Sequence, residues 1–379
     1  MRLINIFAKE INSGPMGMLR IVVGAAAIAQ GFLTWEIMTT WLLPSTVHGK
    51  TLPFIPDISS GGVPFYAALW ILAGLSFALG IYTHASGPLL FILIAYKLAL
   101  GQELFSNHEY LLLLLTMLLT VGRSGSSFSL DARLRGKGRE LLKYWPVWLI
   151  KVQISLMYVF TGIAKALSPS FVDGTVLREE LILPTIFDRG WILHGLSLGV
   201  IAGEIAFPFL LWMKATRGRA IFFGTAFHVL TVLLIYQYRL PLVVFCLGTT
   251  FAYVVFLDVE CKSKIVAWDD SCVFCATWVK WFKKLDWFRV HVFIGASDTQ
   301  SLKLLGISTQ EARDAIQYMD GTHRSSGIDG IKDILGNLPL TFLFASALSL
   351  PGVRAIGDLS YRLVARRRIT CALGRMGES

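Results

Sequence analysis

The chain has 379 residues, of which 54% are apolar and 16% are charged, and its formal net charge is +10. Soluble globular proteins carry about 25% charged residues, so this composition excludes an ordinary soluble protein as well as a disordered or collagen-like one. Five cysteines in this length are too few for a disulfide-rich secreted fold. The composition is that of a membrane protein.

Charged residues are unevenly distributed along the chain. Residues 1–260 hold 33 of them, whereas residues 261–379 hold 27 in less than half that length. We therefore predict a transmembrane domain over 1–260 and a small soluble domain over 261–379. No alternation of basic and aromatic residues suggests nucleic acid as a partner, so we expect the positive charge to face the membrane surface.

Apolar runs of about 17 to 25 residues, the length that crosses a bilayer, recur along the first domain. The predicted fold class is an all-α polytopic membrane bundle of about eight transmembrane helices, followed by a small α/β domain. The predicted helices cover residues 16–35, 63–82, 87–103, 104–122, 147–167, 191–213, 220–238 and 240–257.

Lysine and arginine residues indicate how this bundle is oriented. If the N-terminus lies inside, the inner segments contain eleven of them and the outer loops contain four. The positive-inside rule then places both termini in the cytoplasm, together with the soluble domain. The expected location is the inner membrane of a bacterium.

Ionisable side chains inside a membrane are costly and usually face a cavity or a partner, so each is a functional candidate. In the orientation above, His108, Lys165, His194 and His228 come from four helices and fall in the outer half of the bundle, with Asn107 beside the first of them. Each also has a structural interpretation: the lysine can extend to the headgroups, and the histidines can be interfacial or hydrogen-bonded in the core.

The other polar residues of the spans have structural interpretations too. Glu204 follows glycines at every fourth position from 195 to 203, a pattern typical of close helix packing. Arg20 and Lys151 lie near inner helix ends, from which we expect them to extend to the headgroups. Lys97 lies deeper, and the sequence assigns it no partner. No histidine or glutamate pair has metal-binding spacing, so we predict no metal site.

Around these residues the sequence resembles the HTTM domain, the membrane part of vitamin K-dependent gamma-carboxylase and its bacterial relatives. The resemblance covers most of residues 10–258. It rests on the blocks Ser-Asn-His-Glu-Tyr-Leu at 106–111, Ser-Leu-Asp at 129–131, Gln-Ile-Ser-Leu-Met-Tyr at 153–158, Thr-Gly-Ile-Ala-Lys at 161–165 and Phe-His at 227–228.

The resemblance implies a site that faces outward. The lysine that matches Lys165 is the family's base for oxygenating vitamin K hydroquinone, and the histidine that matches His108 serves the same site. It therefore implies a quinone or hydroquinone cofactor, with O2 and CO2 as further reactants. We predict Asn107, Glu204 and His228 as supporting residues, Glu204 because it is an ionisable residue inside a span. The chain departs from the carboxylase in its short outer loops, which lack the region that holds the protein substrate, and in Ala164, where the carboxylase has a second lysine.

The soluble domain opens on a predicted strand over 263–268, followed by a helix to about residue 285 and a second strand over 290–294. Cys272 and Cys275 form a Cys-x-x-Cys motif at the start of that helix. This placement favours thiol–disulfide exchange, because a helix N-terminus stabilises the Cys272 thiolate, although the carboxylates of Asp269 and Asp270 oppose the effect. The alternatives are inert thiols or half of a zinc site. The candidate further zinc ligands, which have irregular spacings, are Cys261, Cys371, His291 and His323.

The soluble domain resembles the DCC family of thiol–disulfide oxidoreductases over nearly all of residues 262–379. That resemblance implies a thioredoxin-like fold and a redox-active disulfide between Cys272 and Cys275, preceded by the family's Asp269; Asp270 replaces the usual glycine. The apolar run 338–350 is too short to span, so we expect a buried or surface-docked helix. The motif blocks are Asp-x-x-Cys-x-x-Cys at 269–275, Leu-Pro-Leu at 338–340, Pro-Gly-Val-Arg at 351–354, Tyr-Arg at 361–362 and the arginines 366–368.

Three functions remain open from the sequence. The first is an enzyme of the carboxylase or oxygenase type that uses a hydroquinone at the outer site and carries a cytoplasmic redox domain. The second is a membrane thiol–disulfide oxidoreductase that passes electrons between the cysteine pair and a bundle-bound quinone. The third is a non-catalytic maturation or immunity protein for a secreted peptide. The expected partners are the lipid bilayer, a quinone and a secreted peptide or protein, without nucleic acid.

The predicted topology has a direct test. A single cysteine placed in segment 123–143 should escape a membrane-impermeant maleimide in intact cells and react once the cells are permeabilised, because this segment carries much of the inner positive charge. A cysteine in the predicted outer loop over 36–62 is the matched control. Strong labelling of the inner position in intact cells would contradict the orientation.

Overall fold

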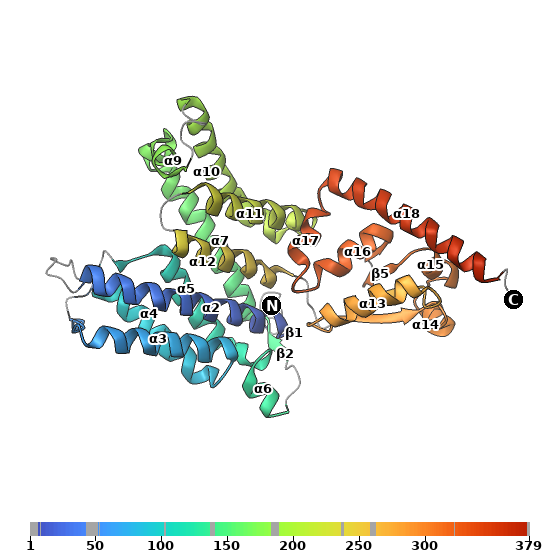
Figure 1. Cartoon of the computed structure of the whole chain (residues 1–379), viewed down its shortest axis with the longest axis horizontal. Helices are drawn as coiled ribbons and strands as arrows, with labels where there is room; N and C mark the ends of the chain where they lie inside the picture. The colour runs from blue at the N-terminus through green and yellow to red at the C-terminus, as the bar shows by residue number, and fades with distance from the viewer. Residues whose placement is uncertain are drawn as a thin grey trace. The chain divides into compact units, whose positions relative to one another are not determined.

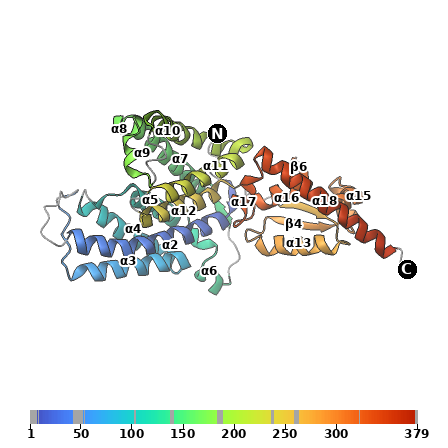
Figure 2. The ribbon, with the colours of Figure 1, turned by 45° about the horizontal axis from the view of Figure 1, so that its top comes forward.

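A computed structural model describes residues 7, 9–42, 52, 54–101, 104–136, 141–182, 189–235, 239–257, 263–321 and 323–376. The chain divides into two compact units. The first comprises Met1–Trp212 and Gly224–Phe256, and the second comprises Met213–Phe223 and Leu257–Ser379. The first unit is a bundle of helices, and the second combines helices with a sheet (Figures 1 and 2).

Helices lie at all eight positions where the sequence predicts a span. Among the described residues, six helices are long and apolar enough to cross a membrane, and Asn107–Val121 and Pro241–Phe256 are shorter apolar helices. The bundle is thus a multi-pass membrane domain, whereas a count of eight spans stays a prediction. The helices are α2 (Gly14–Ile37), α3 (Gly62–Leu79), α4 (Thr83–Leu100), α5 (Asn107–Val121), α7 (Trp145–Ala166), α10 (Gly190–Trp212), α11 (Lys214–Leu234) and α12 (Arg239–Ala252).

Short elements connect these helices. A π-helix, Met38–Leu42, extends α2, and the 3-10 turns are Ser124–Ser126 and Tyr253–Phe256. The strand β1 (Glu10–Asn12) pairs antiparallel with β2 (Leu141–Lys143), which places the start of α2 and the end of the 123–143 segment at the same end of the bundle. The short helices are α6 (Leu130–Leu134), α8 (Pro169–Val172) and α9 (Thr175–Glu180).

Arg20 fixes the same end of the bundle from inside. Its side chain is fully buried, and its guanidinium donates hydrogen bonds to the carbonyls of Ser124 at 2.6 Å, Ser127 at 3.0 Å and Phe128 at 2.6 Å. The expectation that Arg20 extends to the headgroups is therefore wrong. The loop after α5 supplies the acceptors that water would otherwise provide, and charge-assisted bonds of this kind are the stronger ones.

Lys97 of α4 has a partner that the sequence did not assign. Its Nζ lies 2.5 Å from Oε1 of Glu109 in the first turn of α5, and the two side chains are only 2% and 3% exposed. The helices α4 and α5 pack on one another, so residues twelve apart in the chain face each other. The pair neutralises two charges that would otherwise be isolated in the bundle.

The second unit has a four-stranded sheet in the order β4-β3-β5-β6. β3 (Lys264–Trp268) runs parallel to β4 (His291–Gly295) and antiparallel to β5 (Gln317–Asp320), which pairs antiparallel with β6 (His323–Ser326). This is a βαβ unit followed by a β-hairpin and a helix, and its first three elements confirm the predicted strand, helix and strand. The helices are α13 (Val273–Leu285), α14 (Thr299–Leu304), α15 (Thr309–Asp314), α16 (Gly327–Gly336), α17 (Phe342–Ala347) and α18 (Pro351–Met376).

Each face of this sheet has its own apolar core. Successive residues of a strand point to opposite faces, so Val266 and Ala267 of β3 enter different clusters. Val266 packs with Phe282 of α13 and Ile334 of α16, and Ala267 packs with residues of α14 and α15. The apolar run 338–350 forms α17, whose Phe342 and Ala345 are buried, as one of the two predicted alternatives requires.

The Lys97–Glu109 pair gives a stability prediction. Lys97→Met should destabilise the bundle by about 3–5 kcal/mol, because it leaves a carboxylate buried without its cation. The double variant Lys97→Met with Glu109→Leu should recover most of that loss, since it removes both charges and keeps the volume. Unfolding of the detergent-solubilised protein measures both changes; equal losses in the single and the double variant would contradict the pairing.

Candidate functional site

The cysteine motif lies where β3 leads into α13. Cys272 is the N-cap of the helix, and its Sγ accepts a hydrogen bond from the backbone N–H of Cys275 at 3.3 Å. Both cysteines are thiols and partly exposed. This contact places a backbone N–H donor on the sulfur of Cys272, at the first turn of the helix.

Asp269 and Asp270 have different surroundings. Asp269 Oδ1 accepts from the N–H of Ser271 at 3.1 Å and from its hydroxyl at 2.6 Å, which closes the turn before Cys272. The Asp270 carboxylate instead accepts from the N–H of Ser297 at 3.1 Å, after β4. A Cβ at Gly295 would collide with that carboxylate where it now lies, so the Asp270 side chain occupies space that Gly295 leaves open. Asp270 is therefore bound to the loop after β4.

The same motif has the geometry of a partial metal site. Ligand atoms of Asp269, Cys272 and Cys275 all lie within 4.8 Å of one another. A structural zinc ion takes four ligands, and the two histidines considered from the sequence bind elsewhere: His291 to Asp286 at 3.3 Å and His323 to Asp333 at 3.0 Å. Cys261 lies outside the described residues, as does the side chain of Cys371.

Asp286 holds the chain between α13 and β4. Its carboxylate accepts from the N–H groups of Val290 at 3.2 Å and His291 at 2.9 Å. Burial by itself would raise the pKa of Asp286, but the hydrogen bonds and the charge of His291 lower it below the ordinary value. The far end of the cysteine helix is thus fixed by an ionised carboxylate.

An apolar pocket of about 400 Å³ lies against Cys275. Phe274, Trp278 and Phe282 of α13 form one wall, and residues of α16, α17 and α18 form the others. Cys272 is not among its lining residues. A sequence signal for this pocket is the row of aromatic residues Phe274, Trp278 and Phe282 along α13.

Lys165 and Glu204 form an ion pair inside the bundle. Lys165 Nζ, at the end of α7, lies 2.5 Å from Glu204 Oε1 in α10, with side chains 30% and 9% exposed. Glu204 Oε2 is buried without a hydrogen-bond partner among the described residues. The two helices pack tightly at Gly162, where a Cβ would lie 2.8 Å from Ile205 Cγ1.

The close packing expected along the glycines of α10 is not found in the part of the chain that the structure describes. A Cβ at position 195, 199 or 203 would meet no atom within 4 Å, so that face of α10 is open. Glu204 lies on the other face, towards α7. The small residue that allows the close approach therefore comes from α7, within the block at 161–165.

His228 belongs to a buried hydrogen-bonded group. Tyr158 Oη lies 2.7 Å from His228 Nε2 and 2.7 Å from Tyr253 Oη, and all three side chains are buried. The ring of Phe207 packs against both tyrosines. His228 is thus hydrogen-bonded in the core, and its partner Tyr158 ends the sequence block 153–158.

The other predicted residues of the outer half are separate from the ion pair. Among the described residues, no hydrogen bond, ion pair or ring contact joins His108 to Lys165. The His108 ring packs at a tilt of 42° against the ring of Phe245 in α12, with 4.3 Å between centroids. A cavity of about 40 Å³ beside it has room for a water molecule. Asn107 is exposed at the start of α5, and His194 Nδ1 bonds the Val172 carbonyl at 2.7 Å.

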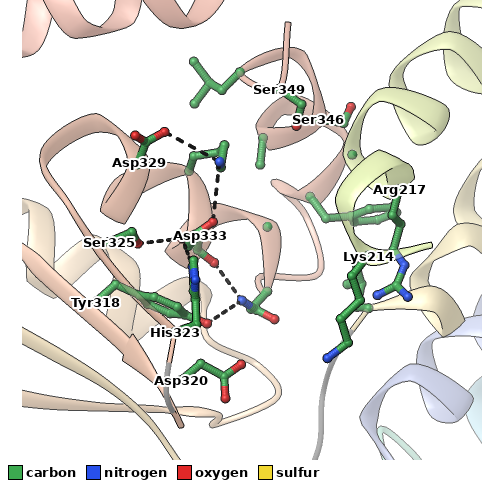
Figure 3. Close-up of a pocket in the computed structure, with 18 of the residues that line it drawn as sticks. Lys214, Arg217, Tyr318, Asp320, His323, Ser325, Asp329, Asp333, Ser346 and Ser349 are labelled. Carbon is green, nitrogen blue, oxygen red and sulfur yellow. Dashed lines mark hydrogen bonds and ion pairs between the residues drawn. The ribbon is translucent and has the colours of Figure 1, made fainter. Parts of the chain in front are cut away.

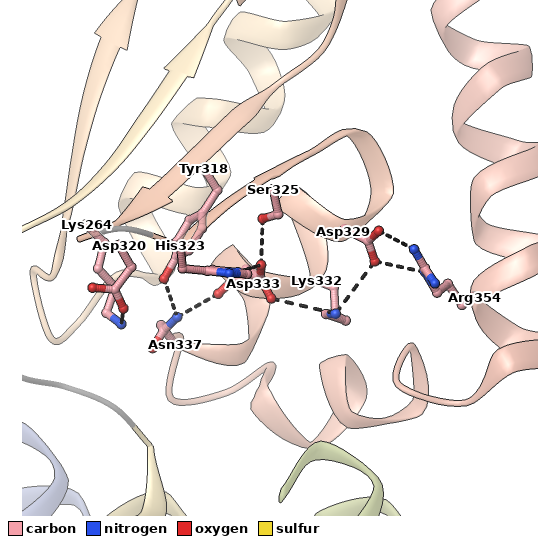
Figure 4. A network of polar contacts seen from close by, with 10 residues as sticks. All are labelled: Lys264, Tyr318, Asp320, His323, Ser325, Asp329, Lys332, Asp333, Asn337 and Arg354. Atoms are coloured by element: carbon pink, nitrogen blue, oxygen red, sulfur yellow. Dashed lines mark hydrogen bonds and ion pairs between the residues drawn. The ribbon is translucent and has the colours of Figure 1, made fainter. Parts of the chain in front are cut away.

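A polar pocket of about 1140 Å³ in the second unit was not predicted (Figure 3). Some of its charged residues form ion pairs in a network (Figure 4): Lys264 binds Asp320 at 2.7 Å, and Arg354 binds Asp329 at 2.5 Å. Burial by itself would raise the pKa of Asp329, but the hydrogen bond from Arg354 and the charge of Lys332 lower it. This network ties α16 to α18, and we assign it a structural role.

Comparison with known proteins agrees with this architecture. The model of the HTTM domain matches residues 8–251, and the model of the DCC1-like thiol-disulfide oxidoreductase matches residues 266–372. No curated protein and no solved structure matches the sequence. The fold and the cysteine site define a multi-pass membrane redox protein. The chain belongs to the HTTM family and carries a DCC1-like domain after the bundle.

Proposed function

We propose that the protein is a membrane-anchored thiol–disulfide oxidoreductase whose working pair is Cys272 and Cys275, in a domain with the thioredoxin-like order of strands. The hydrogen bond from the Cys275 N–H to Cys272 Sγ, at the first turn of α13, carries this proposal. The bond gives a backbone donor to the sulfur of the more N-terminal cysteine, and we take this cysteine as the nucleophile of the exchange reaction.

The exchange has two steps. Cys272 Sγ attacks one sulfur of a substrate disulfide, the substrate S–S bond breaks, and the departing sulfur takes up a proton. Cys275 Sγ then loses its proton, attacks Cys272 Sγ and releases the second substrate sulfur as a thiol. The substrate gains two electrons and two protons, and the protein is left with one disulfide. The spacing of the pair within 4.8 Å supports the second step.

A second candidate function is favoured by the Lys165–Glu204 pair. A vitamin K-like hydroquinone would supply two-electron reducing power there, with O2 and CO2 as the further reactants of a carboxylase-like reaction. Lys165 Nζ can pass its proton to Glu204 Oε1, 2.5 Å away, and so become an amine able to accept another. Glu204 Oε2, which has no partner among the described residues, can accept a hydrogen bond from a phenol.

The other residues proposed for this hydroquinone site lie farther from the Lys165–Glu204 pair. The cavity beside His108 is of water size, which suits a proton carrier rather than a surface for an aromatic ring. Asn107 and His228 would support the site at a distance. We place it in the outer half of a bundle with cytoplasmic termini in a bacterial inner membrane, and the shared end of β1 and β2 supports that arrangement. A secreted peptide would be the substrate to carboxylate.

The cysteine proposal predicts distinct phenotypes for two variants. Cys272→Ser should abolish reduction of a soluble disulfide, and Cys275→Ser should accumulate a mixed disulfide, because the second step then lacks its thiol. Cys246→Ser, which changes a buried thiol of α12, is the control and should behave as the parent. Gel-shift alkylation measures each state. Stoichiometric zinc on the parent, with no redox-dependent shift, would rule the proposal out.

Substitutions of Lys165 can distinguish its proposed role as a base from a role as an anchor at the lipid headgroups. Lys165→Ala and Lys165→Arg should each lower hydroquinone oxidation by about 10²- to 10⁴-fold, because a guanidinium keeps its proton. An anchor would tolerate arginine. Lys143→Arg, at an exposed ion pair with Glu10, is the matched control. Parental turnover by purified Lys165→Arg would leave Lys165 with a structural role only.

A further inference from the structure

The apolar pocket against Cys275 has the size and the lining of a small-molecule site. Ligand pockets are mostly apolar clefts of about 300–1,000 Å³ with a few polar groups, and this pocket has about 400 Å³. Its polar side chains include Asp269 and Ser360, and its aromatic ones include Phe274 and Trp278. A thiol in the wall of such a pocket places a two-electron donor directly against whatever binds there.

The position of the pocket constrains the occupant. A peptide disulfide would bond to Cys272, the proposed nucleophile, yet Cys272 does not line the pocket and Cys275 does. The occupant is therefore better described as an electron acceptor that takes electrons from the cysteine pair without being a disulfide. Aromatic walls favour a planar ring, since aromatic groups pack face-offset or edge-to-face at about 4.5–7 Å between centroids.

The membrane bundle in the same chain favours an acceptor that dissolves in lipid. A planar, apolar, lipid-soluble molecule that takes two electrons and two protons is a quinone. We propose that the pocket binds the ring of a lipid-soluble quinone, which the Cys272–Cys275 dithiol reduces. This inference rests on the proposed thiol function and names its electron acceptor. The site lies within the DCC1-like domain, separate from the bundle-bound quinone considered from the sequence.

The reaction balances within the named groups. The two S–H bonds of Cys272 and Cys275 break, an S–S bond forms between their sulfur atoms, and two electrons pass to the quinone ring. The two quinone oxygens receive the two protons, which gives a hydroquinone. Asp269 is placed to carry these protons, because its carboxylate is within 4.8 Å of both sulfurs and also lines the pocket.

The pocket can be blocked without touching the cysteines. Ser360 lies on the exposed side of α18 and lines the pocket, so Ser360→Trp should fill it with an indole. Leu363→Trp is the matched control, because Leu363 is 54% exposed on the same helix and is not a lining residue. Both variants add one tryptophan to α18, and only the first occupies the proposed quinone site.

The experiment follows one turnover of the full-length, pre-reduced protein in detergent with decylubiquinone. Thiol loss by alkylation and hydroquinone formation by absorbance should proceed together in the parent and in Leu363→Trp. In Ser360→Trp both should slow by about tenfold or more, a loss of about 1.4 kcal/mol in transition-state binding. Decylubiquinone should also quench the fluorescence of Trp268 and Trp278, the two tryptophans that line the pocket, and the double variant Trp268→Phe with Trp278→Phe should lose most of this quenching.

A parallel assay with a water-soluble aromatic disulfide separates this inference from the thiol function. Normal disulfide reduction by Ser360→Trp, together with its slow quinone reduction, supports the pocket. Normal disulfide reduction with no quinone-driven thiol loss in the parent would overturn the quinone site and leave the thiol function standing. Equal quinone rates in Ser360→Trp and the parent would also overturn it. Absence of both reactions in the parent would overturn the thiol function itself.

Discussion

In the hydrocarbon core of a bilayer a charged side chain has no water to hydrogen-bond with, and three cations of this bundle each lie against an acceptor from another segment. Arg20 binds the carbonyls of the loop after α5, Lys97 binds Glu109, and Lys165 binds Glu204. Each contact joins helices or loops distant in the sequence, so the cost of an unpaired charge fixes which segments are neighbours. The first two pairs are almost fully enclosed, whereas Lys165 remains 30% exposed and its partner keeps one unbonded oxygen. That difference separates a structural pair from a candidate reactive one.

In the second unit, the proposed reactive group, the Cys272 thiol, has to be accessible and also held in place. The parallel pairing of β3 with β4 sets the start of α13 at the end of a buried strand, which presents Cys272 at a helix N-terminus. Asp269 closes the preceding turn, and Asp286 fixes the other end of the helix through two backbone N–H groups. The replacement of a family glycine by Asp270 is accommodated in the same way: its carboxylate binds the loop after β4, opposite a glycine that leaves space for it.

The two proposals together would place two redox chemistries in one protein. In the bundle, the Lys165–Glu204 pair can only move protons, so the reaction proposed there would take its electrons from a hydroquinone. In the DCC1-like domain the sulfur atoms themselves carry two electrons, and the apolar pocket beside Cys275 would bring an acceptor to them. The two proposals make opposite use of a quinone, as a donor in the bundle and as an acceptor at the cysteines.

The sequence by itself determined the features that depend on local pattern. Apolar runs long enough to cross a bilayer located the helices, and β-branched and Cys-x-x-Cys patterns located β3, α13 and the thiol at the N-terminus of that helix. Only the tertiary structure decided which side chains meet, because contacts between helices depend on their rotation and depth. It paired Lys97 with Glu109 and brought Tyr158 to His228. It also buried Arg20 against backbone carbonyls, which every residue has and which no sequence pattern can therefore single out. It also left the glycine face of α10 open and placed Gly162 at the contact between α7 and α10 instead. Small residues indicate that a helix face can pack closely, but they do not show which helix packs there.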